Sequence, residues 1–589
     1  MSHTCSFDLS DPTDTAWAPP LRYTREQNRR PDYVELKIPT RTLPETMAKT
    51  NTTTKTSIRN ELKTTATILQ AGGASIKDIT LSKSSIHRKR AKAVKDAATK
   101  KKGAFTAPEF GVVHFDGKVV HYADHSKEDR LAVLLSSPTV IDHQFLGSPV
   151  IPNGTGGVMA QAIRAMLVVW SLVQCVVAQV MDTTASNTGW LGGACAILEQ
   201  ILGRPILWLG CRHHTGELHI KHAYVACRGD VFTKGKDNTL FKRLHNEWDN
   251  LYDWMRRNPG QYTTWEWPAD PNDWKYIRAE LVLSWAREFM ISGDFRRGDH
   301  RELIELIVIY LAGIVMRPRK NKEPQPIVPY LLSRPIATNQ TRFMGIGNHE
   351  MKIALLLDVF QQDEEGREQT LALAEIMVLL HAPYFLKARL ASAAPRLDRD
   401  YYRDLVEYRS LHPAGSLRYR MASEMIQSHL RHTWYLTQEV VVFSLWDEDL
   451  LPRERKAVAN ALLRCEPPPH WSIGKPHLPK QLNANPRLQD CVGPRSHLIF
   501  HSLRVGTNWL SRPVRTWPTD PEYLRIHEWL RDLKVVNDCA ERCIKDITEY
   551  ANVCKDSVHR DEIIMVVEDH RFVLQDITRD GLANANLID

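Results

Sequence analysis

The stretch Val176–Gly189, VVAQVMDTTASNTG, decides most about this chain. Its first six residues are an apolar run that predicts a buried strand. Asp182 follows where the run gives way to a turn rich in Thr, Ser, Asn and Gly. An acid at the carboxyl end of a core strand faces the edge of the sheet where active sites collect. The alternative is that Asp182 caps the helix that follows it.

A second acid occupies a comparable place upstream. The segment Phe110–Lys118, FGVVHFDGK, predicts a strand that turns near Gly117 and puts Asp116 close to a hairpin. A second strand at 118–122 resumes directly after this turn, and a third strand follows at 130–136. The next elements are a helix at 155–170, the Asp182 strand, a helix at 192–202 and a strand at 205–210. This order predicts an α/β fold with a mixed sheet and helices on its faces.

Three strands followed by two crossover units form the RNase H-like arrangement, in which the first and fourth strands are neighbours. Asp116 and Asp182 are therefore expected to converge. Convergent carboxylates suit Mg²⁺ or Mn²⁺. Two such ions, about 3.5–4 Å apart, stabilise the attacking and leaving oxygens of phosphodiester cleavage. A third acid from a late helix is needed to complete the site.

The chain resembles the hAT superfamily of DNA transposases. The resemblance is carried by HFDGKVV, DRLAVLLSS, DTTASNTG, GAC…LEQ and CRHH, with Asp182 opening the Asp…Ser-Asn turn and Cys211-x-x-His214 after the next strand. It covers roughly residues 105–580 and is specific over 111–220 and near 534–572. Such proteins, most of them uncharacterised, occur in invertebrate genomes. It implies that Cys211 and His214 are structural or contact DNA. Zinc binding with Cys227 or His222 is the alternative.

The resemblance also implies the third acid, in a Glu-Arg pair on a helix after a long insertion. Glu541-Arg542 matches it, in a segment with apolar residues at helical spacing. Asp538 lies three residues earlier, near the same helix face, and is the reserve candidate, with Glu568 a further possibility. An isolated Glu-Arg pair is more often a solvated surface pair. The predicted catalytic and metal-binding set is Asp116, Asp182 and Glu541.

The activity that the resemblance implies is metal-dependent cleavage of element ends and strand transfer into target DNA. The partners would be double-stranded DNA and further copies of the chain, in the nucleus, with no membrane. The alternative is a non-catalytic DNA- or chromatin-binding protein domesticated from such an element. The net charge of +8 fits a nucleic-acid partner without requiring one. The ten scattered cysteines favour reduced thiols over a disulfide framework.

Residues 1–105 are expected to be a basic, largely disordered region. Arg88, Lys89 and Arg90 belong to a basic run that predicts nuclear targeting or contact with the DNA backbone, with a solvated tail as the alternative. Relatives often carry a zinc finger at this end. Cys5 is the only cysteine before Cys175, which excludes a Cys/His module of that kind.

The rest of the chain is divided into a first part of the catalytic core at 106–224, an all-α insertion at 225–525 and final core helices at 526–589. Six tryptophans between 248 and 285 are expected to pack between helices rather than stack on bases. Thr341–Met344 is similar to a motif of the inserted domain in which an aromatic residue stacks on a flipped base. By that resemblance Arg342 and Phe343 are candidate DNA contacts.

Overall fold

The computed structural model describes a large part of the 589 residues. The described residues are 83–122, 125–229, 238–258, 260–292, 298–313, 316–319, 322–326, 344–531, 533–551, 554 and 556–574. The chain divides into two compact units, Met1–Ala93 and Val94–Asp589. The sheet, its helices and the candidate site all belong to the second unit.

A mixed sheet forms the centre of this unit. Its path is β3-β2-β1-β5-β6, and the short strand β4 also pairs with β2. The bounds are Gly111–His121 (β1), Lys127–Ser137 (β2), Val140–Gly147 (β3), Val150–Ile151 (β4), Val176–Met181 (β5) and Leu207–Gly210 (β6). β1, β2 and β3 pair antiparallel, whereas β1, β5 and β6 pair parallel. The predicted mixed sheet is confirmed, and the strands expected to lead to Asp116 and Asp182 are neighbours. The predicted hairpin at Gly117 is wrong, because β1 continues through Gly117, which pairs with Leu131 of β2, and the third antiparallel strand is β3 instead.

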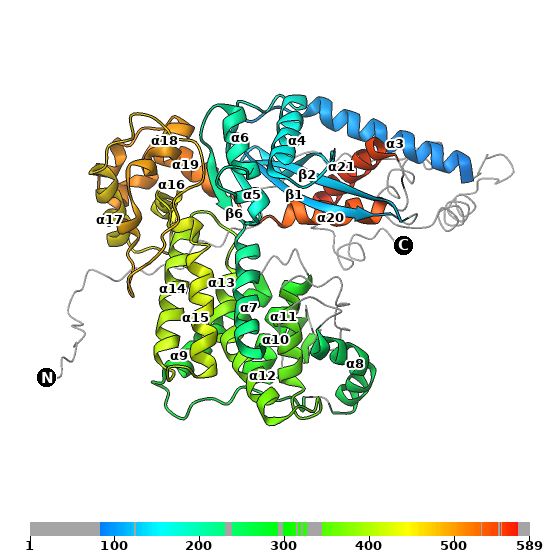
Figure 1. Ribbon diagram of the computed structural model, residues 1–589, viewed down its shortest axis with the longest axis vertical. Coiled ribbons are helices and arrows are strands. Elements are labelled where there is room, and N and C mark those ends of the chain that lie inside the picture. The colour runs from blue at the N-terminus through cyan, green and yellow to red at the C-terminus, as the bar shows by residue number, and fades with distance from the viewer. Residues whose placement is uncertain are drawn as a thin grey trace. The chain divides into compact units, whose positions relative to one another are not determined.

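Helices cover both faces of the sheet. Figure 1 shows α4 (Gly156–Val169) and α6 (Ala194–Leu202) on one side and α20 (Asp538–Ala551) on the other, with α21 (Ser557–Leu574) packed against α20. Every residue of β5 is buried, because an apolar strand between two parallel neighbours is covered above and below. The uninterrupted apolar run that identified this strand is the consequence of that position.

A second hydrophobic core is built by helices and reaches from Ile220 to Ile426. The tryptophans between 248 and 285 pack in or against it, which confirms the packing interpretation. The stretch 225–525 was expected to be all-α. It also contains an antiparallel hairpin of two short strands, β7 and β8, which corrects that expectation. The bounds are Arg212–Arg228 (α7), Thr239–Arg257 (α8), Trp274–Ser292 (α9), Gly298–Ala312 (α10), Met316–Arg319 (β7), Lys322–Pro326 (β8), Met344–Leu355 (α11), Glu364–Ile376 (α12), Met377–His381 (the π-helix η5), Ala382–Leu386 (α13), Ala394–Ser410 (α14) and Leu417–Leu430 (α15).

The helices after residue 430 join the core of the sheet instead. The Trp434 and Trp208 rings stack 6.3 Å apart, and the Tyr435 hydroxyl donates to the carbonyl of Gly210 at the end of β6. The stretch 225–525 therefore contributes to two cores. These elements are Trp434–Leu436 (η6), Gln438–Val441 (α16), Val442–Trp446 (η7), Pro452–Leu463 (α17), Leu488–Cys491 (η8), Pro494–His497 (η9), Leu498–Leu503 (α18), Asn508–Ser511 (η10), Val514–Thr519 (η11) and Pro521–Arg531 (α19).

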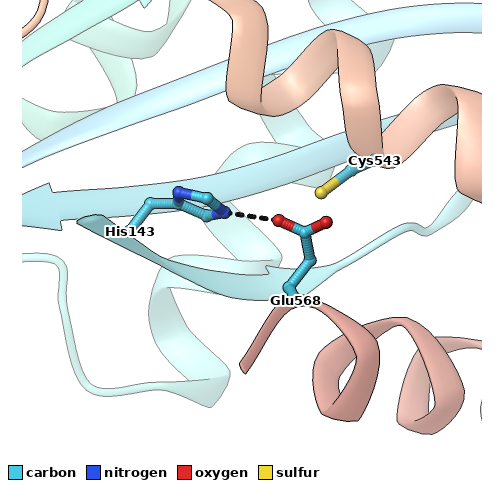
Figure 2. Close-up of side chains that lie close together, drawn as sticks. All are labelled: His143, Cys543 and Glu568. Atoms are coloured by element: carbon cyan, nitrogen blue, oxygen red, sulfur yellow. Dashed lines mark hydrogen bonds and ion pairs between the residues drawn. The ribbon is translucent and has the colours of Figure 1, made fainter. Parts of the chain in front are cut away.

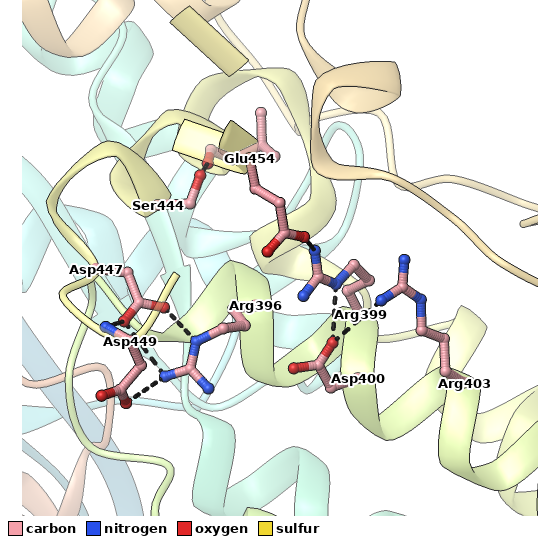
Figure 3. A network of polar contacts seen from close by, with 9 residues as sticks. Arg396, Arg399, Asp400, Arg403, Ser444, Asp447, Asp449 and Glu454 are labelled. Atoms are coloured by element: carbon pink, nitrogen blue, oxygen red, sulfur yellow. Dashed lines mark hydrogen bonds and ion pairs between the residues drawn. The ribbon is translucent and has the colours of Figure 1, made fainter. Parts of the chain in front are cut away.

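Ion pairs join the two cores where α14 meets the elements that follow it. Figure 3 shows Arg396 donating to Asp447 and Asp449, one helical turn from Arg399, which donates to Asp400 and Glu454. Arg396 and Asp447 are largely buried, so their pairing is protected from solvent screening. The network fixes one end of α14 against the segment that packs on the sheet.

Part of the basic N-terminal region is helical. α3 spans Lys83–Ala104, which corrects the expectation of disorder for these residues. Lys, Arg and Ala are good helix formers, and Val94 and Ala98, four residues apart, are buried in the core of the sheet. These two side chains give the helix an apolar contact with the core, which its highly basic composition does not predict. Residues 1–82 lie outside the described residues.

One described segment, Glu364–Leu386, is long and apolar enough to cross a membrane by length and composition. It comprises α12, η5 and α13, and 83% of its most apolar window is buried inside the protein. Its apolar side chains belong to the second hydrophobic core. Packing within the fold therefore accounts for its composition.

Candidate active site

Asp116 and Asp182 lie at the same level on neighbouring strands. β1 and β5 pair parallel with His114 opposite Val180, and each aspartate follows two residues later. Adjacent strands lie about 4.8 Å apart, and side chains at the same level point to the same face. A Cβ on Gly117 would lie 3.6 Å from the sulfur of Met159 in α4, so Asp116 points to the opposite face, where α20 lies.

The carboxylate of Asp182 is held by the turn that follows it. Its Oδ1 accepts hydrogen bonds from the Thr184 hydroxyl (2.8 Å) and from the side-chain amide of Asn187. The helix α5 (Ala185–Thr188) begins after Thr184, so Asp182 is not its N-cap. Among the described residues, no hydrogen bond of Asp182 uses Oδ2. One oxygen is thus fixed by the chain and the other is left for a ligand.

Asn537, immediately before α20, ties that helix to β1. Its side-chain amide donates to the carbonyl of Phe115 (2.8 Å), the residue before Asp116, and its backbone N–H donates to the sulfur of Cys211 (3.2 Å). The N–H of Cys211 in turn donates to the carbonyl of Met181 (2.8 Å), the residue before Asp182. This connected set brings the backbone beside both aspartates to the start of α20.

Glu541 is the predicted third acid and lies in the first turn of α20. It lies four residues after Asn537, whose carbonyl accepts its N–H, and residues at this spacing share a helix face. The reserve candidate Asp538 accepts a hydrogen bond from His213 (2.9 Å) instead. Glu568 accepts from Arg542 and forms an ion pair with His143. Glu541 therefore stays the predicted third acid, on the helix that Asn537 joins to β1.

Arg542 is not the solvated partner that an isolated Glu-Arg pair would suggest. Figure 2 shows Glu568 of α21 beside His143 of β3, with Cys543 of α20 close by. Arg542 donates to both carboxylate oxygens of Glu568. Burial by itself would raise the pKa of Glu568, but the hydrogen bonds from His143 and Arg542 hold that pKa well below its usual range. The pair joins α20 to α21.

Cys211 has a structural position. It is fully buried, and its sulfur accepts the N–H groups of His214 (3.5 Å) and Asn537, which caps the start of α7. Burial raises the pKa of its thiol to about 12, so the thiol is protonated at neutral pH. The sulfur of Cys211 has no surface to offer DNA. The side chain of His214, the last residue of the motif, is partly exposed, so His214 stays a candidate DNA contact.

The oxygen atoms around the two aspartates fit a hard divalent cation. Besides the carboxylates, three buried oxygens, Oγ1 of Thr183 and Oδ1 of Asn187 and of Asn537, have no hydrogen-bond partner within the part of the chain that the structure describes. Each lies on a residue that follows Asp182 or is bonded beside Asp116. Buried acceptors are ordinarily satisfied, and Mg²⁺ with its bound waters would satisfy oxygens of this kind.

The remaining predicted residues lie away from this point or outside the description. Arg88 and Lys89 are exposed on α3, and Arg90 is partly exposed there. Arg342 and Phe343 lie outside the described residues. Sequence reasoning missed Asn537, although an Asn directly before an acidic first turn is a helix-start signal that could have drawn attention to it. His213, inside the Cys-x-x-His motif, is buried.

The chain matches no family model and no curated protein.

Proposed function

We propose that this protein is a hAT-like DNA transposase with an RNase H-like catalytic core, which cleaves element ends and joins them to target DNA. The observation that carries the proposal is the parallel register that sets Asp116 level with Asp182. The strand path β3-β2-β1-β5-β6, with its antiparallel half and its parallel half, is the order expected of such a core. The helical core between Ile220 and Ile426 would be the inserted region of such a protein.

Asp116, Asp182 and Glu541 would hold Mg²⁺ or Mn²⁺. When bound, two such ions stabilise the attacking and leaving oxygens of a phosphodiester. The chain itself supplies fixed oxygen ligands, because Thr184 and Asn187 orient Asp182 before any substrate arrives. Asn537 holds α20 against β1, so that Glu541 faces the same region. Positioning of this kind removes the cost of ordering the ligands during the reaction.

Cleavage of DNA duplexes that carry the ends of the element encoding this chain tests the proposal. The wild-type protein should cut with Mg²⁺ or Mn²⁺ and not with EDTA. Asp182→Asn should bind the duplex with unchanged salt dependence, because phosphate contacts come from Lys and Arg, and should cut at least about 1,000-fold more slowly because one carboxylate charge is lost. The matched control is Asp569→Asn, an exposed acid on α21.

Each outcome of this experiment has a definite meaning. Loss of cutting in Asp182→Asn alone supports the transposase. Binding without cutting by the wild-type protein contradicts it and identifies a domesticated DNA-binding protein. Equal cutting by wild type and Asp182→Asn would show that Asp182 holds no metal, and the site proposed here would be wrong.

A further inference from the structure

Three potential metal ligands meet where three distant parts of the fold converge. His213 is the second residue of α7, His300 is the third residue of α10 and Asp538 begins α20. One ligand atom from each lies within 4.8 Å of the other two. None of the three belongs to the proposed catalytic set. α7 follows the sheet, α10 belongs to the helical core and α20 carries Glu541, so the cluster connects all three.

The site is closed and largely apolar. His213 and His300 are each 1% exposed, and the side chain of Asp538 is 11% exposed. The ring of Phe385 lies 4.7 Å from His213 and 5.1 Å from His300. A Cβ on Gly216 would lie 2.7 Å from that ring, so glycine at this position lets Phe385 close the site. Two imidazoles and a carboxylate are a costly set to bury unless something binds them.

The hydrogen bonds of His213 leave part of its ring unsatisfied. Nδ1 faces Asp538 at 2.9 Å, and the two imidazole rings are nearly perpendicular with centroids 4.7 Å apart. Nε2 is buried and has no hydrogen-bond partner among the described residues. A simple His–Asp ion pair would not explain why a second imidazole lies against His213 in an apolar enclosure.

We propose that His213, His300 and Asp538 bind one transition-metal ion of the zinc class. Imidazole and carboxylate are its ordinary ligands, and a bound water at the partly exposed side of Asp538 would complete four-coordination. The ligand atoms of a tetrahedral zinc site lie about 3.4 Å from one another. Side-chain movements of about 1 Å would bring the three ligand atoms to that separation. The ion would clamp the helical core and α20 to the end of the sheet.

The second ligand cluster, His143, Cys543 and Glu568 in Figure 2, does not support the same inference. Arg542 already donates to both oxygens of Glu568 and lies 3.4 Å from His143. Its guanidinium occupies the place of a cation and would repel a metal. The inference for His213, His300 and Asp538 is independent of the proposed DNA cleavage.

Metal analysis of the full-length protein tests the site. Protein produced with Zn²⁺ and exchanged into buffer with excess Mg²⁺ should retain one zinc per chain. His300→Ala and Asp538→Asn should each lower zinc affinity by more than about 100-fold, beyond the loss typical of outer-shell partners. His121→Ala, at the exposed end of β1, and His143→Ala are the controls and should retain the metal.

X-ray absorption of the zinc-loaded wild type makes the result independent of variant folding. Two imidazole nitrogens with an oxygen shell and no sulfur support the site. Sulfur in the shell, or metal lost only from His143→Ala, would place the ion at Cys543 and overturn the assignment. Folded wild type that retains less than about a tenth of an equivalent, or both ligand variants retaining the full equivalent, would also overturn it.

Discussion

The side-chain amide of Asn537 donates a 2.8 Å hydrogen bond to the backbone carbonyl of Phe115, across 422 residues of sequence. Phe115 precedes Asp116, and Asn537 precedes the helix of Glu541. This bond, together with the sulfur of Cys211, fixes the distance between strand β1 and the start of α20. The proposed active site depends on it, although Asn537 itself binds no substrate.

Asn537→Ala should therefore weaken both the fold and the activity. The carbonyl of Phe115 would be left buried without its donor, which costs about 1–3 kcal/mol of unfolding free energy. Cutting should fall by at least about tenfold, because Glu541 is no longer held near Asp116. Urea titration and end-cleavage rates measure the two effects. Asn483→Ala, exposed in a loop, is the control. Unchanged stability in Asn537→Ala would contradict the role of this bond.

Glu568→Gln should destabilise the protein by about 3 kcal/mol, because it leaves the guanidinium of Arg542 without its buried counter-charge. The expected loss is at the low end of the range of about 3–5 kcal/mol for breaking a buried ion pair, because the side chain of Arg542 is 24% exposed. Asp569→Asn removes the next acid of the same helix, which is 55% exposed and pairs with Lys101, and should cost at most about 1 kcal/mol. Equal urea midpoints for the two variants would contradict the prediction.

The buried histidines predict a loss of stability in mild acid. Burial lowers the pKa of His381 to about 3, and burial together with the nearby positive charge of His214 lowers the pKa of His432 to about 3. Both stay neutral in the folded protein, whereas the unfolded chain takes up their protons below a pKa of about 6.5. Their contribution is complete above that pH and is lost progressively as the pH falls toward 3.

From pH 7.5 to pH 5.0 these two groups should remove about 4 kcal/mol of unfolding free energy, at about 1.4 kcal/mol per group and pH unit below 6.5. Urea titrations at the two pH values measure the difference. The double variant His381→Gln, His432→Gln should show a pH-dependent loss smaller than that of the wild type by about 4 kcal/mol, and the loss that remains is expected from other buried histidines, such as His219 and His429, whose pKa burial also lowers. A wild-type stability that does not change over this range would show that the two side chains are not held neutral.

Trp190→Ala should weaken DNA binding by about 5- to 150-fold, corresponding to one stacked base at about 1–3 kcal/mol. Trp190 and Leu191 are 69% and 75% exposed on the turn that follows the loop of Asp182. That turn is held against α4, because a Cβ on Gly156 would lie 2.1 Å from the carbonyl of Gly192. An exposed aromatic on a fixed turn beside the proposed site is suited to contact a base.

Fluorescence anisotropy with single- and double-stranded probes measures this effect, and thermal melting checks that the fold is intact. Val558→Ala removes another exposed apolar side chain, on α21, and should leave affinity unchanged. If Trp190→Ala binds DNA as the wild type does, the turn is not part of the DNA-binding surface.

The local sequence predicted the strands that lead to the two aspartates, although it placed a turn at Gly117 where β1 continues. The apolar run before Asp182 and the alternation around Asp116 predict strands, because burial on one or two faces is written directly into residue order. The same reasoning failed for α3, where only Val94 and Ala98 are buried on an otherwise basic helix. Two contacts at helical spacing are too weak a pattern to outweigh such a composition.

Only the tertiary structure decided the partners of the late acids. Asp538, Glu541 and Glu568 are equivalent as sequence, and the histidines that pair with two of them lie hundreds of residues away. His213 bonds Asp538, and Arg542 with His143 bonds Glu568, whereas Glu541 stays the proposed third acid on the helix that Asn537 joins to β1. Sequence encodes local periodicity, whereas the pairing of charges depends on how helices dock, and docking is determined by the whole core at once.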